Sequence, residues 1–212
     1  GLVFVADTDN SRVQQFRPDG TFVQAFPVRS LQRRSVSHCQ PTCIAVHPAD
    51  STLYVCDAAP GSHTVFLCRS GDGTCFSEIN YAPMSYFTCP SAVVVDAANG
   101  ELYVADSGNR RISVFTAKTG LFRRTLVTRD SVPRPFGLAF DPLARRLVAT
   151  DDSANCLCAI DGKSGALLAS HGTTGCREDQ FRTPRGVCVH PATGQLFVCD
   201  YENGRVHVLQ RL

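Results

Sequence analysis

The chain repeats one short pattern five times, and this repetition limits the folds that it can adopt. Each copy is an apolar strand that ends in a carboxylate, followed by a polar turn and a second strand. The carboxylates lie 50, 49, 45 and 49 residues apart, at Asp7, Asp57, Asp106, Asp151 and Asp200. A near-constant period of this size indicates a repeat architecture. Function is therefore expected on surfaces that the repeats share.

Each unit contains two further strands. A proline-initiated apolar strand precedes each of the last four carboxylates, beginning at Pro41, Pro90, Pro135 and Pro184. A variable strand follows a glycine-containing turn. Four short antiparallel strands in roughly 40–50 residues are typical of a β-propeller blade. The sequence predicts an all-β fold, with residues 1–212 forming one propeller domain of four-stranded blades. Its first and last blades are incomplete, and both a five-bladed ring and a fragment of a six-bladed ring fit the pattern.

The third repeat carries the clearest motif, LYVADSGNRRI at residues 102–112. The first repeat keeps its Asn and Arg as Asn10 and Arg12, and the fifth keeps them as Asn203 and Arg205. This pattern resembles the NHL repeat, which implies a β-propeller. The resemblance extends to the NHL domains of tripartite-motif proteins, which implies a recognition role, in RNA binding or as the substrate-recognition module of a ubiquitin ligase. Because one fold hosts many activities, the likeness says more about the fold than about the function.

The arginine that begins the third strand of a repeat has a structural explanation. Asp and Asn accept main-chain hydrogen bonds in tight turns, and an arginine beside them can pair with the turn carboxylate. We therefore expect Arg12, Arg111 and Arg205 to stabilise their own turns rather than to contact a ligand.

Composition gives an expectation for the compartment. The chain is 43% hydrophobic with a net charge of +2, and it has no apolar stretch long enough for a membrane helix. The odd count of 11 cysteines and the lack of an Asn-x-Ser/Thr sequon favour a reduced, cytoplasmic setting. Cys56 and Cys199 occupy equivalent strand positions and are predicted to be small buried side chains. Cys68 and Cys75 flank a hairpin turn and could face each other across it, so a disulfide between them is geometrically feasible, and the sequence does not decide whether it forms.

No metal or cofactor site is expected. Cys39, Cys43 and His47 suggest zinc ligands. However, the Cα atoms of Cys43 and His47 would lie about 13 Å apart along a predicted strand, which is too far for both side chains to bind one zinc ion. Cys156 and Cys158 form a strand pair without a second chelating pair nearby in the sequence. His47 and His190 share a turn position before a proline, which is a structural explanation for both.

Catalysis is not expected either. The peptidyl-amidoglycolate lyase, a propeller enzyme with related repeats, uses histidines around a central metal. The resemblance would place those histidines at the starts of inner strands, where this chain has Thr42, Ser91, Phe136 and Arg185. No catalytic residues and no small-molecule substrate are predicted, and a lyase or lactonase-like activity ranks last.

The strand order places many arginines on one rim of the predicted propeller. Arginine suits carboxylates, phosphates and base stacking. Residues 28–40 form the most basic insertion and are the best candidate for a partner-contacting loop. The first hypothesis is a non-enzymatic scaffold for a protein or peptide, and the second is binding of single-stranded RNA on the same face. The predicted partner-binding residues are Arg33, Arg34, Thr42, Ser91, Arg110, Arg134, Phe136, Arg182, Arg185 and Tyr201.

Overall fold

The structure is a computed structural model that describes residues 1–29, 39–82, 85–128, 130–210 and 212. The chain divides into two compact units. The first unit comprises Gly1–Leu102 with Phe115–Phe122, and the second comprises Tyr103–Val114 with Arg123–Leu212. In the described part of the chain, regular structure consists of strands and two short 3₁₀ helices, and no helix is long and apolar enough to cross a membrane.

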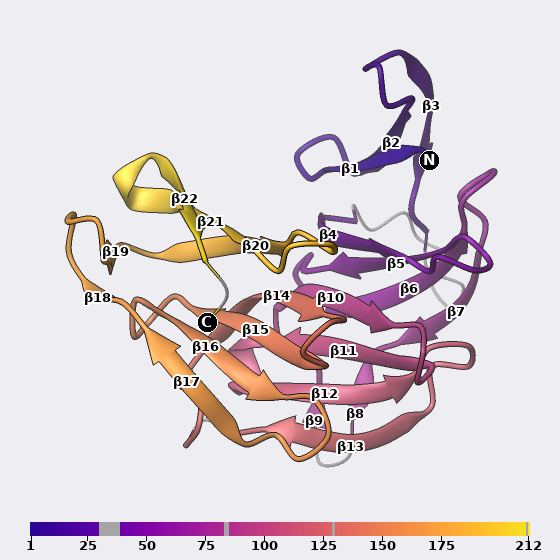
Figure 1. Ribbon diagram of the computed structural model, residues 1–212. Coiled ribbons are helices and arrows are strands. Elements are labelled where there is room, and N and C mark those ends of the chain that lie inside the picture. The colour runs from indigo at the N-terminus through magenta and orange to yellow at the C-terminus, as the bar shows by residue number, and fades with distance from the viewer. Residues whose placement is uncertain (30–38, 83–84, 129, 211) are drawn as a thin grey trace. The chain divides into compact units, whose positions relative to one another are not determined.

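Five antiparallel sheets, one for each repeat, follow one another along the described chain (Figure 1). The first sheet contains β1 (Val3–Asp7), β2 (Arg12–Phe16) and β3 (Phe22–Pro27). The second contains β4 (Pro41–Val46), β5 (Thr52–Asp57), β6 (Thr64–Arg69) and β7 (Cys75–Ile79). The third contains β10 (Pro90–Asp96), β11 (Glu101–Asp106), β12 (Arg111–Thr116) and β13 (Phe122–Val127).

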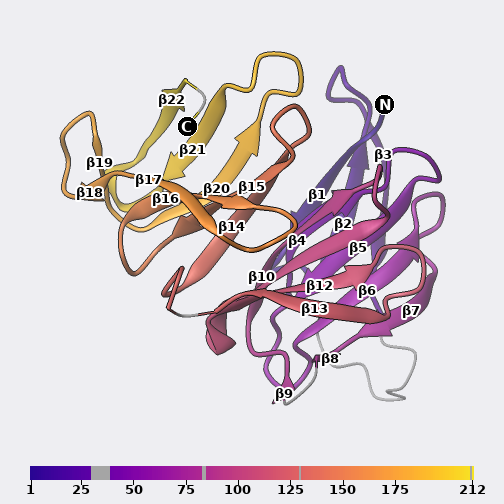
Figure 2. The same ribbon diagram turned by 60° about the horizontal axis from the view of Figure 1, so that its bottom comes forward.

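The fourth and fifth sheets belong to the second unit, and the residues of the third sheet are divided between the two units. The fourth contains β14 (Pro135–Asp141), β15 (Arg146–Asp151), β16 (Cys156–Asp161) and β17 (Leu167–His171). The fifth contains β20 (Pro184–Val189), β21 (Leu196–Asp200) and β22 (Arg205–Leu209), which appear as neighbouring strands in Figure 2. The predicted fold class, an all-β β-propeller of small antiparallel blades, is confirmed.

Short elements connect these sheets. The pair β8 (Tyr81–Ala82) and β9 (Ser85–Tyr86) lies in the first unit, and the parallel pair β18 (Thr173–Thr174) and β19 (Gln180–Phe181) lies in the second. The 3₁₀ helices η1 (Ser107–Asn109) and η2 (Tyr201–Asn203) form the polar turns of the third and fifth repeats.

The repeated aspartate accepts a hydrogen bond from a main-chain amide just before the inner strand of its sheet begins. Asp57 accepts a hydrogen bond from the main-chain amide of Gln40 at 2.7 Å. Asp151 accepts one from Arg134 at 2.8 Å, and Asp200 one from Arg182 at 2.7 Å. The inner strand then has a register shift after its proline, as between Pro135 and Leu138. A β-bulge at this point re-aims the following side chains.

The turn arginines pair with the same aspartates, as predicted. Nε of Arg12 lies 2.7 Å from Asp7, Nε of Arg111 2.7 Å from Asp106, and Nε of Arg205 2.9 Å from Asp200. The asparagine of each motif adds a 2.8 Å hydrogen bond to its aspartate, from Asn10, Asn109 and Asn203. These groups therefore hold their own turns together. Side-chain hydrogen bonds from Arg12, Asn10 and Gln14 also lower the pKa of Asp7.

The repeated tyrosine joins neighbouring sheets inside each unit. Tyr54 Oη donates to the carbonyl oxygen of Ala117 at 3.1 Å in the first unit. Tyr103 Oη donates to that of Gly162 at 3.2 Å in the second. Both side chains are fully buried, so each hydroxyl needs a partner that the next sheet supplies.

Each unit has an apolar cluster between sheets. In the first unit Val13 and Phe26 pack with Leu53, Val55 and Phe66. In the second, Phe181 packs with residues of the fourth and fifth sheets, namely Val148, Leu157, Leu196 and Val198. The faces of the first and fifth sheets directed away from these clusters expose apolar side chains, which include Val3, Val5, Val206 and Val208.

This exposure corrects one prediction. Cys56 is fully buried as expected, but the equivalent Cys199 is exposed. Cys199 pairs with Val206 in register, and it lies on the open face of the fifth sheet. The local pattern is the same at both positions, so the difference comes from what covers the sheet.

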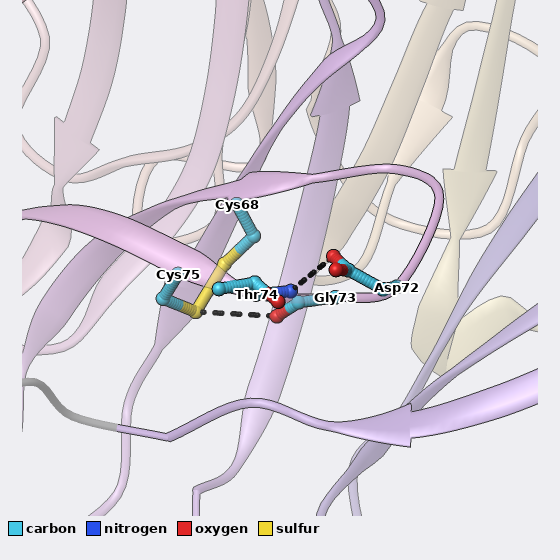
Figure 3. The surroundings of a disulfide bond; sticks show 5 residues. All are labelled: Cys68, Asp72, Gly73, Thr74 and Cys75. Atoms are coloured by element: carbon cyan, nitrogen blue, oxygen red, sulfur yellow. Dashed lines mark hydrogen bonds between the residues drawn. A yellow bond between two sulfur atoms is a disulfide. The ribbon is translucent and has the colours of Figure 1, made fainter.

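A disulfide joins Cys68 and Cys75, a bond whose formation the sequence alone did not decide. The two residues face each other in the register of β6 and β7, and Figure 3 shows their bonded sulfur atoms at the base of the hairpin loop. In that loop the Thr74 amide donates to Asp72 at 2.9 Å. Gly73 packs against the ring of Phe26, where a Cβ atom would clash. The disulfide thus closes a hairpin whose tip lies against the first sheet.

Candidate functional site

The second unit brings four of the predicted partner-binding residues together. Arg185, the second residue of β20, stacks on Tyr201 of η2 with its Cζ atom 3.7 Å from the ring centroid. The same guanidinium lies 5.5 Å from the ring centroid of Phe136, the second residue of β14. The repeat places Phe136 and Arg185 at equivalent positions of two inner strands that lie in contact. Cation–π contacts of this kind contribute roughly 0.5–2 kcal/mol.

Arg134 and Asp152 complete this group, called here the Arg185 cluster: Arg134, Phe136, Asp152, Arg185 and Tyr201. Arg134 Nε lies 3.4 Å from Asp152 Oδ1. The Asp152 side chain is 7% exposed, whereas that of Arg134 is 51% exposed. Burial raises the pKa of Asp152, and the positive charges of Arg134 and Arg185 only partly oppose this. The cluster therefore combines two guanidinium groups with one carboxylate whose charge is disfavoured.

Two buried polar atoms in the Arg185 cluster have no hydrogen-bond partner among the residues that the structure describes. They are Arg185 Nε and Asp152 Oδ1, although the second atom lies 3.4 Å from Arg134 Nε in the ion pair described above. Buried polar atoms in native proteins are nearly always hydrogen-bonded, and an unpaired one costs roughly 1–3 kcal/mol.

Sequence reasoning missed Asp152 as a member of the site. It directly follows the anchoring Asp151, and this Asp-Asp pair occurs only in the fourth repeat. This doubled carboxylate was the one sequence signal that could have marked Asp152 as a site residue. Its burial depends on packing between sheets, which the repeat pattern does not report.

The other predicted site residues lie elsewhere. Arg110 and Arg182 are exposed, and their main-chain amides donate to Ser107 and Asp200. Thr42 and Ser91 belong to the first unit, and Thr42 Oγ1 lies 3.3 Å from the carbonyl oxygen of Pro90. Arg33 and Arg34 lie outside the described residues, as does most of the basic insertion.

Among the described residues, no group of three or more histidine, cysteine, aspartate or glutamate side chains is arranged to hold a metal ion. Cys43 and His47 have other neighbours. Cys43 Sγ lies 3.9 Å from the carbonyl oxygen of Val93, and His47 Nδ1 lies 3.2 Å from Asp50. His190 accepts a hydrogen bond from the Thr193 amide, consistent with a turn role.

Comparisons with known proteins identify the repeat. The NHL repeat model matches residues 87–115 and 181–209. Peptidyl-glycine alpha-amidating monooxygenase B of Xenopus laevis is 29% identical over 111 residues, which cover 49% of this chain and 12% of that protein. Monooxygenase A of the same organism is 28% identical over 111 residues, with the same coverage. The chain thus matches only a small part of these relatives.

Solved structures with the same fold are more distant in sequence. Kuenenia stuttgartiensis hydrazine synthase aligns with a TM-score of 0.67 and 20% identity, over 98% of this chain and 62% of that one. A streptogramin B lyase aligns with a TM-score of 0.66 and 13% identity, over 100% of this chain and 66% of that one. At these identities the likeness shows the fold alone. The matched repeats and the recurring Asp–Asn–Arg turns agree, so the chain contains NHL repeats at residues 87–115 and 181–209.

Proposed function

We propose that the chain is a non-enzymatic recognition module and that its Arg185 cluster binds an acidic segment of a partner protein. The stacked guanidinium of Arg185 carries this proposal. Tyr201 holds the guanidinium plane, so less side-chain entropy is lost when a carboxylate binds to its N–H donors. A planar guanidinium binds carboxylates in a bidentate manner. Arg134 adds a second positive charge at the same place.

A peptide is favoured over single-stranded RNA because the aromatic ring of the Arg185 cluster that could stack on a base, that of Tyr201, already stacks on Arg185. Binding of single-stranded nucleic acid relies on bases that stack on successive free rings along a basic groove. Here one face of Tyr201 is already covered by Arg185 at 3.7 Å. The net charge of the whole chain is only +2. RNA binding and a ubiquitin-ligase role stay predictions from the resemblance, and the first is an outcome of the test below.

The test is fluorescence anisotropy with a labelled glutamate-rich peptide, and with a labelled unstructured RNA pool, each at two salt concentrations. We expect the peptide to bind, and Arg185→Ala to weaken its binding about tenfold or more, which corresponds to about 1.4 kcal/mol. The melting temperature should fall by only a few degrees, because a half-exposed cation–π contact contributes about 1 kcal/mol or less.

Arg17→Ala is the matched control, since Arg17 is an exposed arginine of the first unit and its loss changes the net charge equally. Equal weakening by both variants would show a general charge effect and contradict the proposal. Tight RNA binding that falls steeply with salt, without peptide binding, would identify the site as a phosphate-contacting surface.

A further inference from the structure

Two cysteines of the fourth repeat present their thiols on one face of a strand. Cys156 and Cys158 flank Leu157 on β16, so their side chains project from the same face of the sheet. Their Sγ atoms are 3.9 Å apart. Leu157 faces the opposite way, into the apolar cluster around Phe181. The strand thus brings two sulfur atoms together although their Cα atoms are two residues apart.

We propose that Cys156 and Cys158 form a dithiolate site for a soft, thiolate-seeking metal cation of the Cu(I) type. Cysteine sulfur is the ligand that selects such cations. With metal–sulfur bonds of about 2.3 Å, the observed Sγ separation corresponds to a sulfur–metal–sulfur angle of about 116°. That angle lies between those of tetrahedral and trigonal coordination. The two thiols could therefore chelate one cation with little movement.

A disulfide is a poorer match to the same pair. It would require the two sulfur atoms to approach from 3.9 Å to about 2.05 Å while both residues stay in a regular strand. Chelation keeps the observed separation. The reaction replaces two S–H protons by one cation and needs no oxidant.

The surroundings of the pair favour a thiolate at Cys156. A hydrogen bond from Cys158 lowers the pKa of the Cys156 thiol to about 7, against burial and the Asp151 carboxylate, and the Ser170 hydroxyl adds a smaller lowering. The same hydrogen bond, burial and the neighbouring negative charges raise the pKa of the Cys158 thiol, so the cation would have to displace the second proton on binding. Cys158 pairs with Ser170 in register, and Cys156 with Asp151. Asp151 raises the cost of two bare thiolates, but it also attracts a cation.

Access to the pair is from one side. Cys156 is half-buried, whereas Cys158 is 3% exposed, so a cation would reach Cys156 first. Asp151 is occupied by the main-chain amides of Arg134, Ser153 and Ala154. Since the described residues offer no group of three such ligands, the third ligand would come from solution, as a small thiol or water.

The test maps cysteine reactivity on the full chain. The protein is treated anaerobically with one equivalent of Cu(I), then with an alkylating reagent, and each cysteine is quantified by mass spectrometry. We expect Cu(I) to slow alkylation of Cys156 at least tenfold and to leave the exposed Cys89 and Cys188 unchanged. In Cys158→Ala the protection of Cys156 should be lost, because one thiol cannot chelate.

Cys56→Ala is the matched control. Cys43 and Cys56 face each other in register on β4 and β5, and form a second cysteine pair that belongs to the first unit and not to the proposed site. Protection of Cys156 should survive in that variant. Protection that persists in Cys158→Ala, or that appears on other cysteines instead, would overturn the proposal. If Cys158→Ala does not fold, Cys158→Ser replaces it, and loss of the protection of Cys156 is expected in that variant as well.

Discussion

Replacing Arg111 with alanine should lower the free energy of unfolding by about 3 kcal/mol, because it leaves a buried carboxylate without its cation. Asp106 is fully buried and Arg111 nearly so, with Nε 2.7 Å from the carboxylate. In a domain of this size, such a loss corresponds to a fall in melting temperature of roughly 6–12 °C. Thermal unfolding followed by circular dichroism measures it.

The first repeat provides the control for this experiment. Arg12 and Asp7 have the same motif and the same 2.7 Å separation, but the Arg12 side chain is 43% exposed. Exposed ion pairs contribute about 0–1 kcal/mol, so Arg12→Ala should change the melting temperature by only a few degrees. If the two variants lose equal stability, burial does not determine the strength of the pair, and the structural role given to Arg111 is wrong.

Removing the Cys68–Cys75 disulfide should cost about 2–3 kcal/mol. The two residues are separated by 7 positions in the sequence, and the chain-entropy model gives a stabilisation of this size for so short a loop. Cys68→Ala/Cys75→Ala should therefore melt roughly 4–12 °C below the wild type. Because Gly73 at the hairpin tip packs on Phe26, loosening the hairpin should also disturb the first sheet.

Reducing agent separates the disulfide from other effects of the double substitution. The wild type in strong reductant should approach the melting temperature of the double variant, and the double variant should not respond to reductant. Cys89→Ala, at an exposed free cysteine, is the control and should melt like the wild type. A wild type that melts equally with and without reductant would show that the bond does not stabilise the fold.

The disulfide also bears on the expected compartment. Disulfides persist in oxidising environments and are rare in the cytosol. The cytoplasmic setting expected from the odd cysteine count stays a prediction, and this bond argues against it. The count alone could not reveal the bond, because only the register of β6 and β7 places these two of the 11 cysteines opposite each other.

The sequence predicted the blades well because the signals for them are local. The aspartate that ends one strand, the asparagine three residues later and the arginine five residues later make their contacts within one turn, as in Asp106, Asn109 and Arg111. Such contacts recur with the motif. The predicted role of the turn arginines is confirmed for the same reason.

The site was less accessible to sequence reasoning. Phe136, Arg185 and Tyr201 were predicted from their places in the repeat, but their stacking on one another depends on how the fourth and fifth sheets pack. The burial of Asp152 and the exposure of Cys199 depend on the same packing. Whether the predicted residues bind a partner stays a prediction.

The uneven covering of the sheets sets the order in which the amide protons should exchange with solvent. In the first unit β5 is buried along nearly its whole length, whereas alternate residues of β1 are exposed. In the second unit β15 is fully buried and β22 has no fully buried residue. Local opening costs least where little apolar surface is buried. Deuterium should therefore enter β1 and β22 first, and β5 and β15 should exchange only when their units unfold as a whole.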